Sequence, residues 1–132
     1  MTQNAEKNFE WKEGISLSLY KDSLGYISRI TMYHNKDKVG FVQINQISGK
    51  SIVTMMKVFD NFRDQGYGSQ LVEALNGFLD SKQLDGNLKN AILGLKENQK
   101  DVYKFEKSGI YERHGWTPVS PDSELLERKF IK

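Results

Sequence analysis

The sequence predicts a mixed α+β fold in a single domain covering residues 1–132. The expected core is one mixed, mostly antiparallel sheet of six or seven strands with two main helices. Two observations lead to this expectation. Short apolar or β-branched runs separated by turn residues fill the first half of the chain. In the second half, runs with helical apolar spacing alternate with extended runs, and a strand, a helix and a strand in succession imply a parallel crossover. The predicted order is β-β-β-β-α-β-α-β.

The first four strands are predicted by alternation and by the turns between them. Ile15, Leu17 and Leu19 alternate with polar residues, as expected for a strand with one buried face. The strands are expected at residues 15–19, 26–34, 38–47 and 51–58. Turns are expected at residues 22–25, 35–37 and 48–50. Because these connections are short, the four strands should form an antiparallel meander. The polar N-terminal segment is given no element, with Phe9 and Trp11 as anchors.

The second half begins with a helix that follows Gly68 and runs to about Lys82. Its apolar residues recur with helical spacing and predict one buried face. They are Leu71, Leu75, Phe78 and Leu79. Asp85-Gly86 is expected to end the helical segment. The remaining elements are a buried strand at 90–95, a helix from about 100 to 113, an extended piece at 116–119 and a final strand at 124–131. Asn98 is expected near the start of the second helix and Gly115 at its end.

Composition excludes several classes of protein. The chain has 132 residues, of which 38% are hydrophobic and 27% charged, as expected for a soluble globular protein. A net charge of +2 is too small to indicate nucleic-acid binding. There is no cysteine, and the two histidines lie far apart, so neither thiol chemistry nor a metal site is expected. No apolar run approaches the ~20 residues that span a bilayer, and no signal sequence is visible, so a cytoplasmic location is expected.

The stretch from Val58 to Leu71 joins a predicted strand to a predicted helix, and its turn contains Gly66 and Gly68. Glycine lets a ligand approach the backbone closely, and the start of a helix presents free N–H groups and a partial positive charge. Together these features predict an anion site, most naturally for phosphate. The stretch lacks both the Gly-Lys-Ser/Thr of a P-loop and the third glycine of a dinucleotide fingerprint.

Two segments resemble one known family. The run Arg63-Asp64-Gln65-Gly66-Tyr67-Gly68 fits Arg/Gln-x-x-Gly-x-Gly/Ala and closely resembles the acetyl-CoA-binding motif of the GCN5-related N-acetyltransferases, the GNAT family. The run Ile110-Tyr111-Glu112-Arg113-His114-Gly115-Trp116 resembles that family's Phe-Tyr-Glu-Lys-x-Gly-Phe segment. The resemblance covers residues 38–131. The alternative for the first run is a structural turn that uses its glycines only for backbone geometry.

The resemblance implies where CoA binds. Backbone N–H groups of residues 65–69 would hold the pyrophosphate, with the side chain of Arg63 nearby. The edge of the strand at residues 56–58 would pair with the pantetheine amides like an added strand. The family's pantetheine-contacting asparagine falls on Lys104 here, so Asn98 and Lys104 are both open for that role. The expected CoA-contacting residues are Met56, Lys57, Val58, Arg63, Asp64, Gln65, Gly66, Tyr67, Gly68, Ser69 and Asn98.

The resemblance also assigns the chemistry to Tyr111, as the general acid that protonates or hydrogen-bonds the leaving thiolate. A tyrosine hydroxyl is a weaker acid than a thiol, so hydrogen bonding is the expected main contribution. A strand N–H near Met56 would stabilise the developing oxyanion. The base is open between water and Glu97, since residues 51–57 contain no carboxylate. The structural alternative for Tyr111 is a core aromatic. His34 and His114 are both expected at the surface.

The expected function is therefore transfer of an acyl group from acetyl-CoA to a primary amine by direct attack, without a metal. The acceptor, a small molecule or a protein amine, is not visible in the sequence. One departure from the family bears on it: residues 19–26 leave room only for a turn, where GNAT proteins usually have helices covering part of the acceptor cleft. This departure favours the alternative, a non-catalytic CoA-binding or protein-interaction module of the same fold. Nucleic acid and membrane are not expected partners, and a homodimer is left open.

Overall fold

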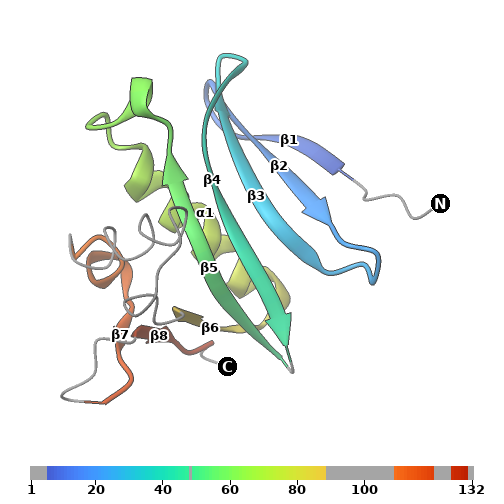
Figure 1. Ribbon diagram of the computed structural model, residues 1–132, viewed down its shortest axis with the longest axis vertical. Helices are drawn as coiled ribbons and strands as arrows, with labels where there is room; N and C mark the ends of the chain where they lie inside the picture. Colours follow the sequence, from blue (N-terminus) through green and yellow to red (C-terminus); the bar gives the residue numbers. More distant parts are fainter. Residues whose placement is uncertain (1–5, 48, 89–108, 121–125, 131–132) are drawn as a thin grey trace.

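The computed structural model describes residues 6–47, 49–88, 109–120 and 126–130 of the chain. These residues form one eight-stranded sheet with a single long helix, α1, packed against it (Figure 1). The strands are β1 (Glu6–Lys12), β2 (Ile15–Lys21), β3 (Ile27–His34), β4 (Asp37–Ile47), β5 (Lys50–Val58), β6 (Asp85–Leu88), β7 (Thr117–Pro118) and β8 (Leu126–Arg128). The helix α1 covers Tyr67–Lys82, and two short 3₁₀ helices, η1 and η2, cover Asp60–Phe62 and Glu112–His114.

The first five strands form the predicted antiparallel meander, in which each strand pairs with the next along the chain. One of them, β1, was not predicted: residues 6–12 pair with β2 in a regular register as far as a bulge between Glu10 and Lys12. The alternation of Phe9 and Trp11 with polar residues is the signal of this edge strand. Phe9 is 38% exposed, so this strand buries little apolar surface and is held mainly by its pairing with β2.

Two turns of the meander are stabilised by local hydrogen bonds and by backbone geometry. Between β2 and β3, a carboxylate oxygen of Asp22 accepts hydrogen bonds from the N–H groups of Leu24 and Tyr26, at 2.9 and 3.0 Å. This confirms that the connection is only a turn. Between β3 and β4, Asn35 and Lys36 have φ angles of 50° and 81°. Positive φ at both central residues is the geometry that matches the right-handed twist of a two-residue hairpin.

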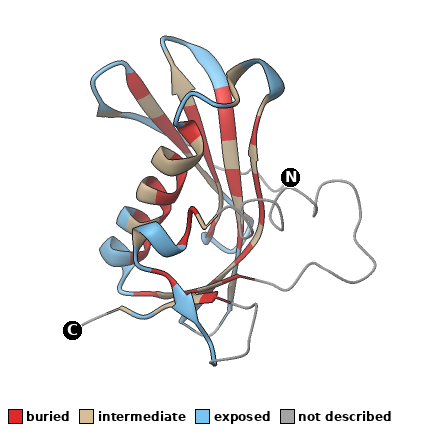
Figure 2. Cartoon of the chain, turned by 90° about the vertical axis from the view of Figure 1, so that its left-hand side faces the viewer, coloured by how far each residue is buried: buried red, intermediate tan, exposed pale blue. Residues whose placement is uncertain are grey.

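The core lies between the sheet and α1, where buried residues line both elements (Figure 2). The predicted buried face of α1 is confirmed in full, since Leu71, Leu75, Phe78 and Leu79 are all buried. On the sheet, one row of directly opposed residues faces this helix. It consists of Leu19, Ile30, Val42 and Met56.

Gly40 sets how closely β4, β5 and α1 approach. A Cβ added to this glycine would lie 2.4 Å from the carbonyl oxygen of Lys57 and 3.0 Å from Leu71 Cδ1. Only glycine fits at this position, because any Cβ atom would require the β5 backbone to move.

The strand β6 lies parallel to β5, as the predicted crossover requires. Its start was predicted wrongly: the Asp85-Gly86 pair was expected to end the helical segment, but it begins the strand. The helix already ends at Lys82, and the next residue, Gln83, adopts a left-handed φ of 57°. Gly86 stands in a strand because Trp116 and Leu79 pack directly over it, 2.6 and 2.7 Å from where its Cβ would be. The predicted strand at 90–95 lies outside the described residues.

The C-terminal segment is less helical than predicted. The second helix was expected to reach residue 113, but residues 109–111 form a turn and η2 is a single 3₁₀ turn. Gly109 has a φ of 75°, which interrupts an α-helix at that point. The rest of the predicted helix lies outside the described residues. The expected end at Gly115 is confirmed, with a φ of 91°. The extended piece at 116–119 contains β7, and the described part of the last strand is Leu126–Arg128.

Candidate active site

The turn between β5 and α1 has the shape expected of an anion site. Gly66 adopts a left-handed φ of 87° directly before the helix, and no side chain caps it. The first backbone hydrogen bond of the helix runs from Gln70 N to Gly66 O, at 3.3 Å. The N–H groups of Tyr67, Gly68 and Ser69 therefore precede the helical ladder and are donors at its positive end. N–H donors at a helix start are the kind of group that binds phosphate oxygens in proteins.

Arg63 differs from the expectation of a phosphate-facing cation. Its Nε donates a hydrogen bond to the carbonyl oxygen of Val58 at 3.0 Å and lies 3.3 Å from an oxygen of Asp60. The guanidinium thus folds back over the end of β5 and ties the loop to the strand. The side chain is 34% exposed, so its charge still reaches the solvent beside the glycine turn.

Replacing Arg63 with alanine is expected to lower the free energy of unfolding by about 1 kcal/mol, because a charge-assisted hydrogen bond to a strand carbonyl is lost at a half-exposed site. CoA binding should weaken by roughly 1–3 kcal/mol through the loss of charge and of loop order. Denaturation in urea and CoA calorimetry measure the two effects. Arg63→Lys separates them, because lysine retains the charge without the Nε bond. Parental CoA affinity in Arg63→Ala would exclude this side chain from donor binding.

Two histidines hold the first turn of α1. His34, at the end of β3, is hydrogen-bonded through Nδ1 to the hydroxyl of Tyr67, and the rings pack edge to face at 5.6 Å. His114, in η2, lies with Nε2 2.5 Å from Ser69 Oγ. The expectation that both are surface histidines was wrong, since each is half-buried against the glycine turn. Their partners are 33 and 45 residues away, so no local pattern points to them.

Tyr111 is completely buried, and its hydroxyl lies 3.6 Å from the sulfur of Met56 on β5. The ring packs edge to face on Trp116 with centroids 5.4 Å apart. Trp116 is itself fixed to α1, because its indole N–H donates to Asn76 Oδ1 at 2.9 Å. The structure thus brings the candidate acid to the strand that the family resemblance gave to the pantetheine arm, although the two residues are 55 positions apart.

The expected pantetheine edge lies where the described pairing of β5 ends. The register of β5 with β6 runs from Lys50 to Val53, whereas its register with β4 continues to Val58. Among the described residues, the last part of β5 is therefore paired on the β4 side only. Met56 and Val58 are buried and Lys57 is half-buried.

The other predicted site residues fall into two groups. Asp64 and Gln65 are exposed in the turn, and Gln65 Nε2 donates to Asn61 O at 3.3 Å. Asn98, with the alternatives Lys104 and Glu97, lies outside the described residues. Within the described ranges, no cluster of three histidine, aspartate or glutamate side chains could hold a metal ion. No helix there is long and apolar enough to cross a membrane.

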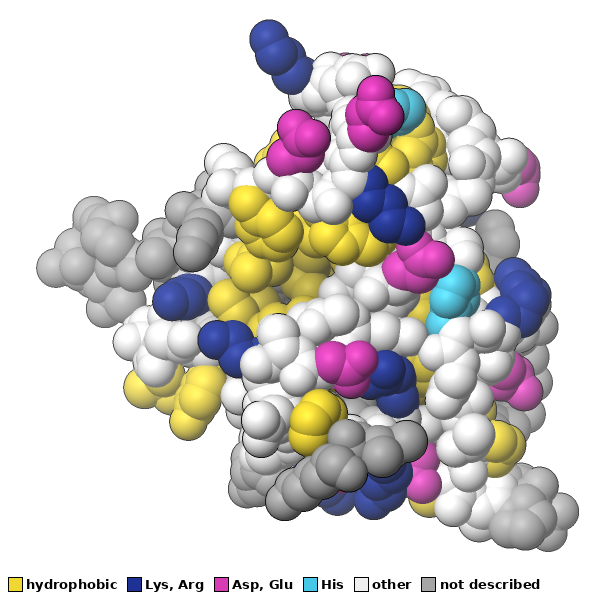
Figure 3. Space-filling model, turned by 180° about the vertical axis from the view of Figure 1, so that it is seen from behind, with side chains coloured by type: hydrophobic (Ala, Val, Ile, Leu, Met, Phe, Trp, Pro, Cys, Tyr) yellow, Lys and Arg dark blue, Asp and Glu magenta, His cyan; other side chains and the backbone are white. Residues whose placement is uncertain are grey.

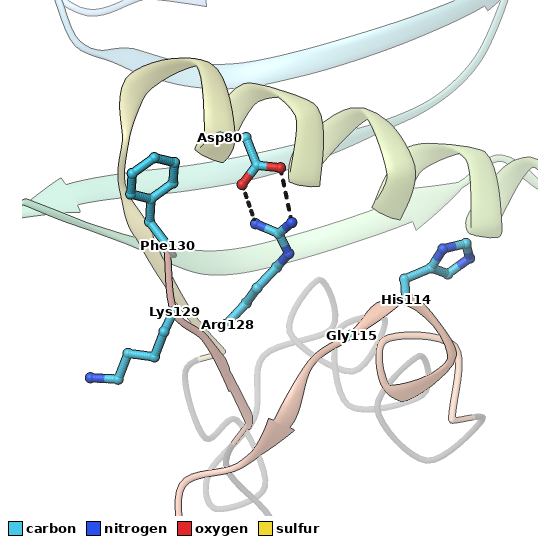
Figure 4. A pocket seen from close by; sticks show the side chains of 6 residues that line it. All are labelled: Asp80, His114, Gly115, Arg128, Lys129 and Phe130. Atoms are coloured by element: carbon cyan, nitrogen blue, oxygen red, sulfur yellow. Dashed lines mark hydrogen bonds and ion pairs between the residues drawn. The ribbon is translucent and has the colours of Figure 1, made fainter. Parts of the chain in front are cut away.

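A cavity of about 570 Å³ lies between α1 and β8 (Figure 4). It is lined by Asp80, His114, Gly115, Arg128, Lys129 and Phe130. Arg128 donates two hydrogen bonds to the carboxylate of Asp80, at 2.7 and 3.0 Å. These bonds hold the pKa of Asp80 below its usual value. Lys129 lies 3.9 Å from Asp85 and 3.8 Å from Glu127. The charges of Arg128 and Lys129 are thus neutralised, and this cavity is structural.

Seen from behind, another hollow in the surface has a floor of hydrophobic side chains (Figure 3).

The sequence of residues 27–118 matches the family model for the acetyltransferase (GNAT) domain, over more than half of the chain. The chain belongs to the GNAT family. No curated protein matches it in sequence. The eight-stranded, mostly antiparallel sheet with α1 against it is the GNAT fold, as the resemblance implied.

Solved structures show the same GNAT fold at low identity. The PaiA N-acetyltransferase from Thermoplasma acidophilum, in complex with coenzyme A, is 13% identical with a TM-score of 0.55, over 77% of this chain and 60% of that one. The ribosomal-protein-S18-alanine N-acetyltransferase from Escherichia coli is 13% identical with a TM-score of 0.59, over 79% and 69%. Naa50 from Arabidopsis thaliana, with a bisubstrate analogue, is 16% identical with a TM-score of 0.52, over 77% and 72%. This chain thus spans less than two thirds of the first of these proteins.

Proposed function

We propose that this GNAT protein transfers an acetyl group from acetyl-CoA to a primary amine by direct attack. The observation that carries the proposal is the contact between the Tyr111 hydroxyl and Met56, 3.6 Å apart, on the part of β5 that is expected to align the thioester. The glycine turn supplies the second support, since the loop that leads to its N–H donors follows the same strand and is tied to Val58 by Arg63. Membership of an acetyltransferase family and neighbours solved with CoA compounds are consistent with both.

The chemistry assigns a separate task to each part of the site. Acetyl-CoA supplies the activated acyl carbon: the amine nitrogen forms a bond to it, the carbon–sulfur bond breaks, nitrogen loses a proton and sulfur gains one. The N–H groups of Tyr67, Gly68 and Ser69 bind the pyrophosphate. Tyr111 donates a hydrogen bond to the sulfur as negative charge develops there. Water takes the proton from the amine, because β5 carries no carboxylate.

One observation favours a second candidate, a non-catalytic CoA-binding module. The connection between β2 and β3 is a turn closed by Asp22, without the helices that cover part of the acceptor cleft in other family members. A CoA-binding module needs the glycine turn but not Tyr111. The two candidates therefore agree on CoA binding and differ on turnover.

The deciding experiment combines CoA calorimetry with an acetylation assay on a panel of amines. We expect micromolar or tighter CoA binding and acetylation of at least one amine class. Tight CoA binding without any transfer would support the non-catalytic candidate. Absence of CoA binding would contradict both.

Replacing Gly68 with valine is expected to weaken CoA binding at least about tenfold, because a branched side chain would stand on the first turn of α1 where the pyrophosphate must approach. Calorimetry measures the affinity. Gly77→Val is the matched control, since Gly77 is an exposed glycine of the same helix with open space around its Cβ position. A folded Gly68→Val protein that binds CoA within about twofold of the parent would place the donor site elsewhere.

A further inference from the structure

A second cavity, of about 420 Å³, lies on the sheet itself. It is lined by Tyr20, Ser28, Arg29, Gln43, Ile44 and Thr54. Each of these side chains is half-buried or buried, so they border a real hollow in the surface. Residues that succeed one another along a strand point to opposite faces. Tyr20, Arg29 and Gln43 directly neighbour the row that faces α1, and their side chains therefore lie on the opposite face of the sheet.

Three polar groups of this cavity belong to one cross-strand row. Tyr20 opposes Arg29 and Arg29 opposes Gln43 in the register of β2, β3 and β4. The hydroxyl of Tyr20, the guanidinium of Arg29 and the amide of Gln43 have no hydrogen-bond or ion-pair partner among the residues that the structure describes. Arg29 lies over the ring of Phe41, 5.0 Å from its centroid, which orients the guanidinium without neutralising it. A half-buried cation between two neutral donors is a site for an anion.

The same row continues to the strand of the candidate active site, because Gln43 opposes Met55 on β5. Thr54 lines the cavity and directly follows Val53, where the described pairing of β5 with β6 ends. Met56, which contacts Tyr111, is two residues further along the same strand. Strands lie about 4.8 Å apart, so the Cα atom of Arg29 is roughly 10 Å from that of Met55 across the sheet. The Met56–Tyr111 contact lies on the α1 face, so a ligand held at Arg29 would approach the expected pantetheine edge of β5 from the opposite face. The short span across the sheet favours a small ligand.

We propose that this cavity binds the acceptor, and that the acceptor is a small amine that also carries a carboxylate, namely an amino acid or a short peptide. This inference rests on the proposed acetyl transfer. Arg29 forms a two-bond pair with the carboxylate, and the Tyr20 hydroxyl and Gln43 amide donate to its remaining lone pairs. The cavity volume is that of a small-molecule site. Polyamines and other purely cationic acceptors are disfavoured, because they would bring positive charge to an unneutralised guanidinium.

The test compares matched acceptors on the parent protein and on Arg29→Gln. Each pair consists of an amino acid and the amine that lacks only its carboxylate, such as lysine with cadaverine and alanine with ethylamine. We expect the parent to acetylate the carboxylate-bearing member with a kcat/KM at least about tenfold higher. Arg29→Gln should reduce kcat/KM for that member about ten- to hundredfold and leave the other member nearly unchanged, as expected for a lost charge-assisted hydrogen bond.

Controls separate this inference from the proposed function. Lys36→Gln removes an exposed cation of the β3–β4 turn and should leave the preference intact. CoA affinity and melting temperature should be parental in Arg29→Gln. If the parent shows no preference within the pairs, or Arg29→Gln lowers both members equally, the inference is overturned. If the parent acetylates nothing, the proposed function fails first. Calorimetry of the amino acids on the CoA-loaded protein then decides the cavity: binding that Arg29→Gln abolishes supports it, and absence of binding overturns it.

Discussion

Tyr111→Phe is expected to lower kcat about a hundredfold while the affinity for acetyl-CoA stays nearly unchanged. The substitution removes one hydroxyl and leaves the ring in its packing on Trp116. A hydrogen bond to the developing thiolate strengthens only in the transition state, so its loss appears in kcat and not in donor binding. General acid catalysis contributes about 10²–10⁴-fold, and the lower end applies because a thiolate is already a fair leaving group.

The measurement is kcat on the best acceptor, with donor affinity and melting temperature determined alongside. The hydroxyl is buried 3.6 Å from the Met56 sulfur, and loss of one buried hydrogen-bonding group should cost about 1 kcal/mol of stability. Tyr26→Phe is the control for stability, because it removes the same hydroxyl from a side chain that is 46% exposed. A Tyr111→Phe protein with parental kcat would remove this residue from the mechanism. A fall in donor affinity equal to the fall in kcat would assign it to binding instead.

Gly40→Ala is expected to destabilise the protein by about 3 kcal/mol, at the upper end for overpacking a close-packed core. The added methyl group would lie 2.4 Å from a backbone oxygen of β5, which cannot rotate away as a side chain can. Either β5 separates from β4 near Lys57 or α1 moves outward at Leu71. Both movements disturb the strand end next to the glycine turn, so we also expect weaker CoA binding.

Chemical denaturation measures this effect against a control of opposite sign. Gly77 lies exposed in the middle of α1 with nothing within 4 Å of its Cβ position. Gly77→Ala should therefore stabilise the protein by about 0.5–1 kcal/mol through helix propensity alone. Equal effects of the two substitutions would show that the contacts at Gly40 relax at little cost.

The fold could be predicted largely because its signals are local. The alternation in β2, the apolar spacing of α1 and the short turns are each visible within about ten residues of sequence. The parts that failed depend on distant packing. Asp85-Gly86 has the composition of a turn, and it forms a strand because Trp116, thirty positions later, occupies the space above Gly86. The edge strand β1 was missed because it is defined by its pairing with β2 and buries little apolar surface of its own.

The candidate site divides in the same way. The glycine turn is a local motif and was predicted with its helix start within two residues. The proximity of Tyr111 to Met56 came from family resemblance, since nothing local brings together residues that far apart. The positions of His34, His114 and Arg29 follow from strand register and from the packing of η2 on α1. Composition and spacing contain no information on strand register or on the packing of η2 against α1.

The attachment of η2 to α1 also constrains how this protein can change over evolutionary time. Ser69 and Asn76 on the helix bind His114 and Trp116, in the segment that contains Tyr111. A substitution on either side of this contact between α1 and residues 114–116 therefore changes the orientation of Tyr111 as well as the first turn of the helix. We expect these four positions to vary together among homologues, so that an exchange at residue 76 is accompanied by one at residue 116.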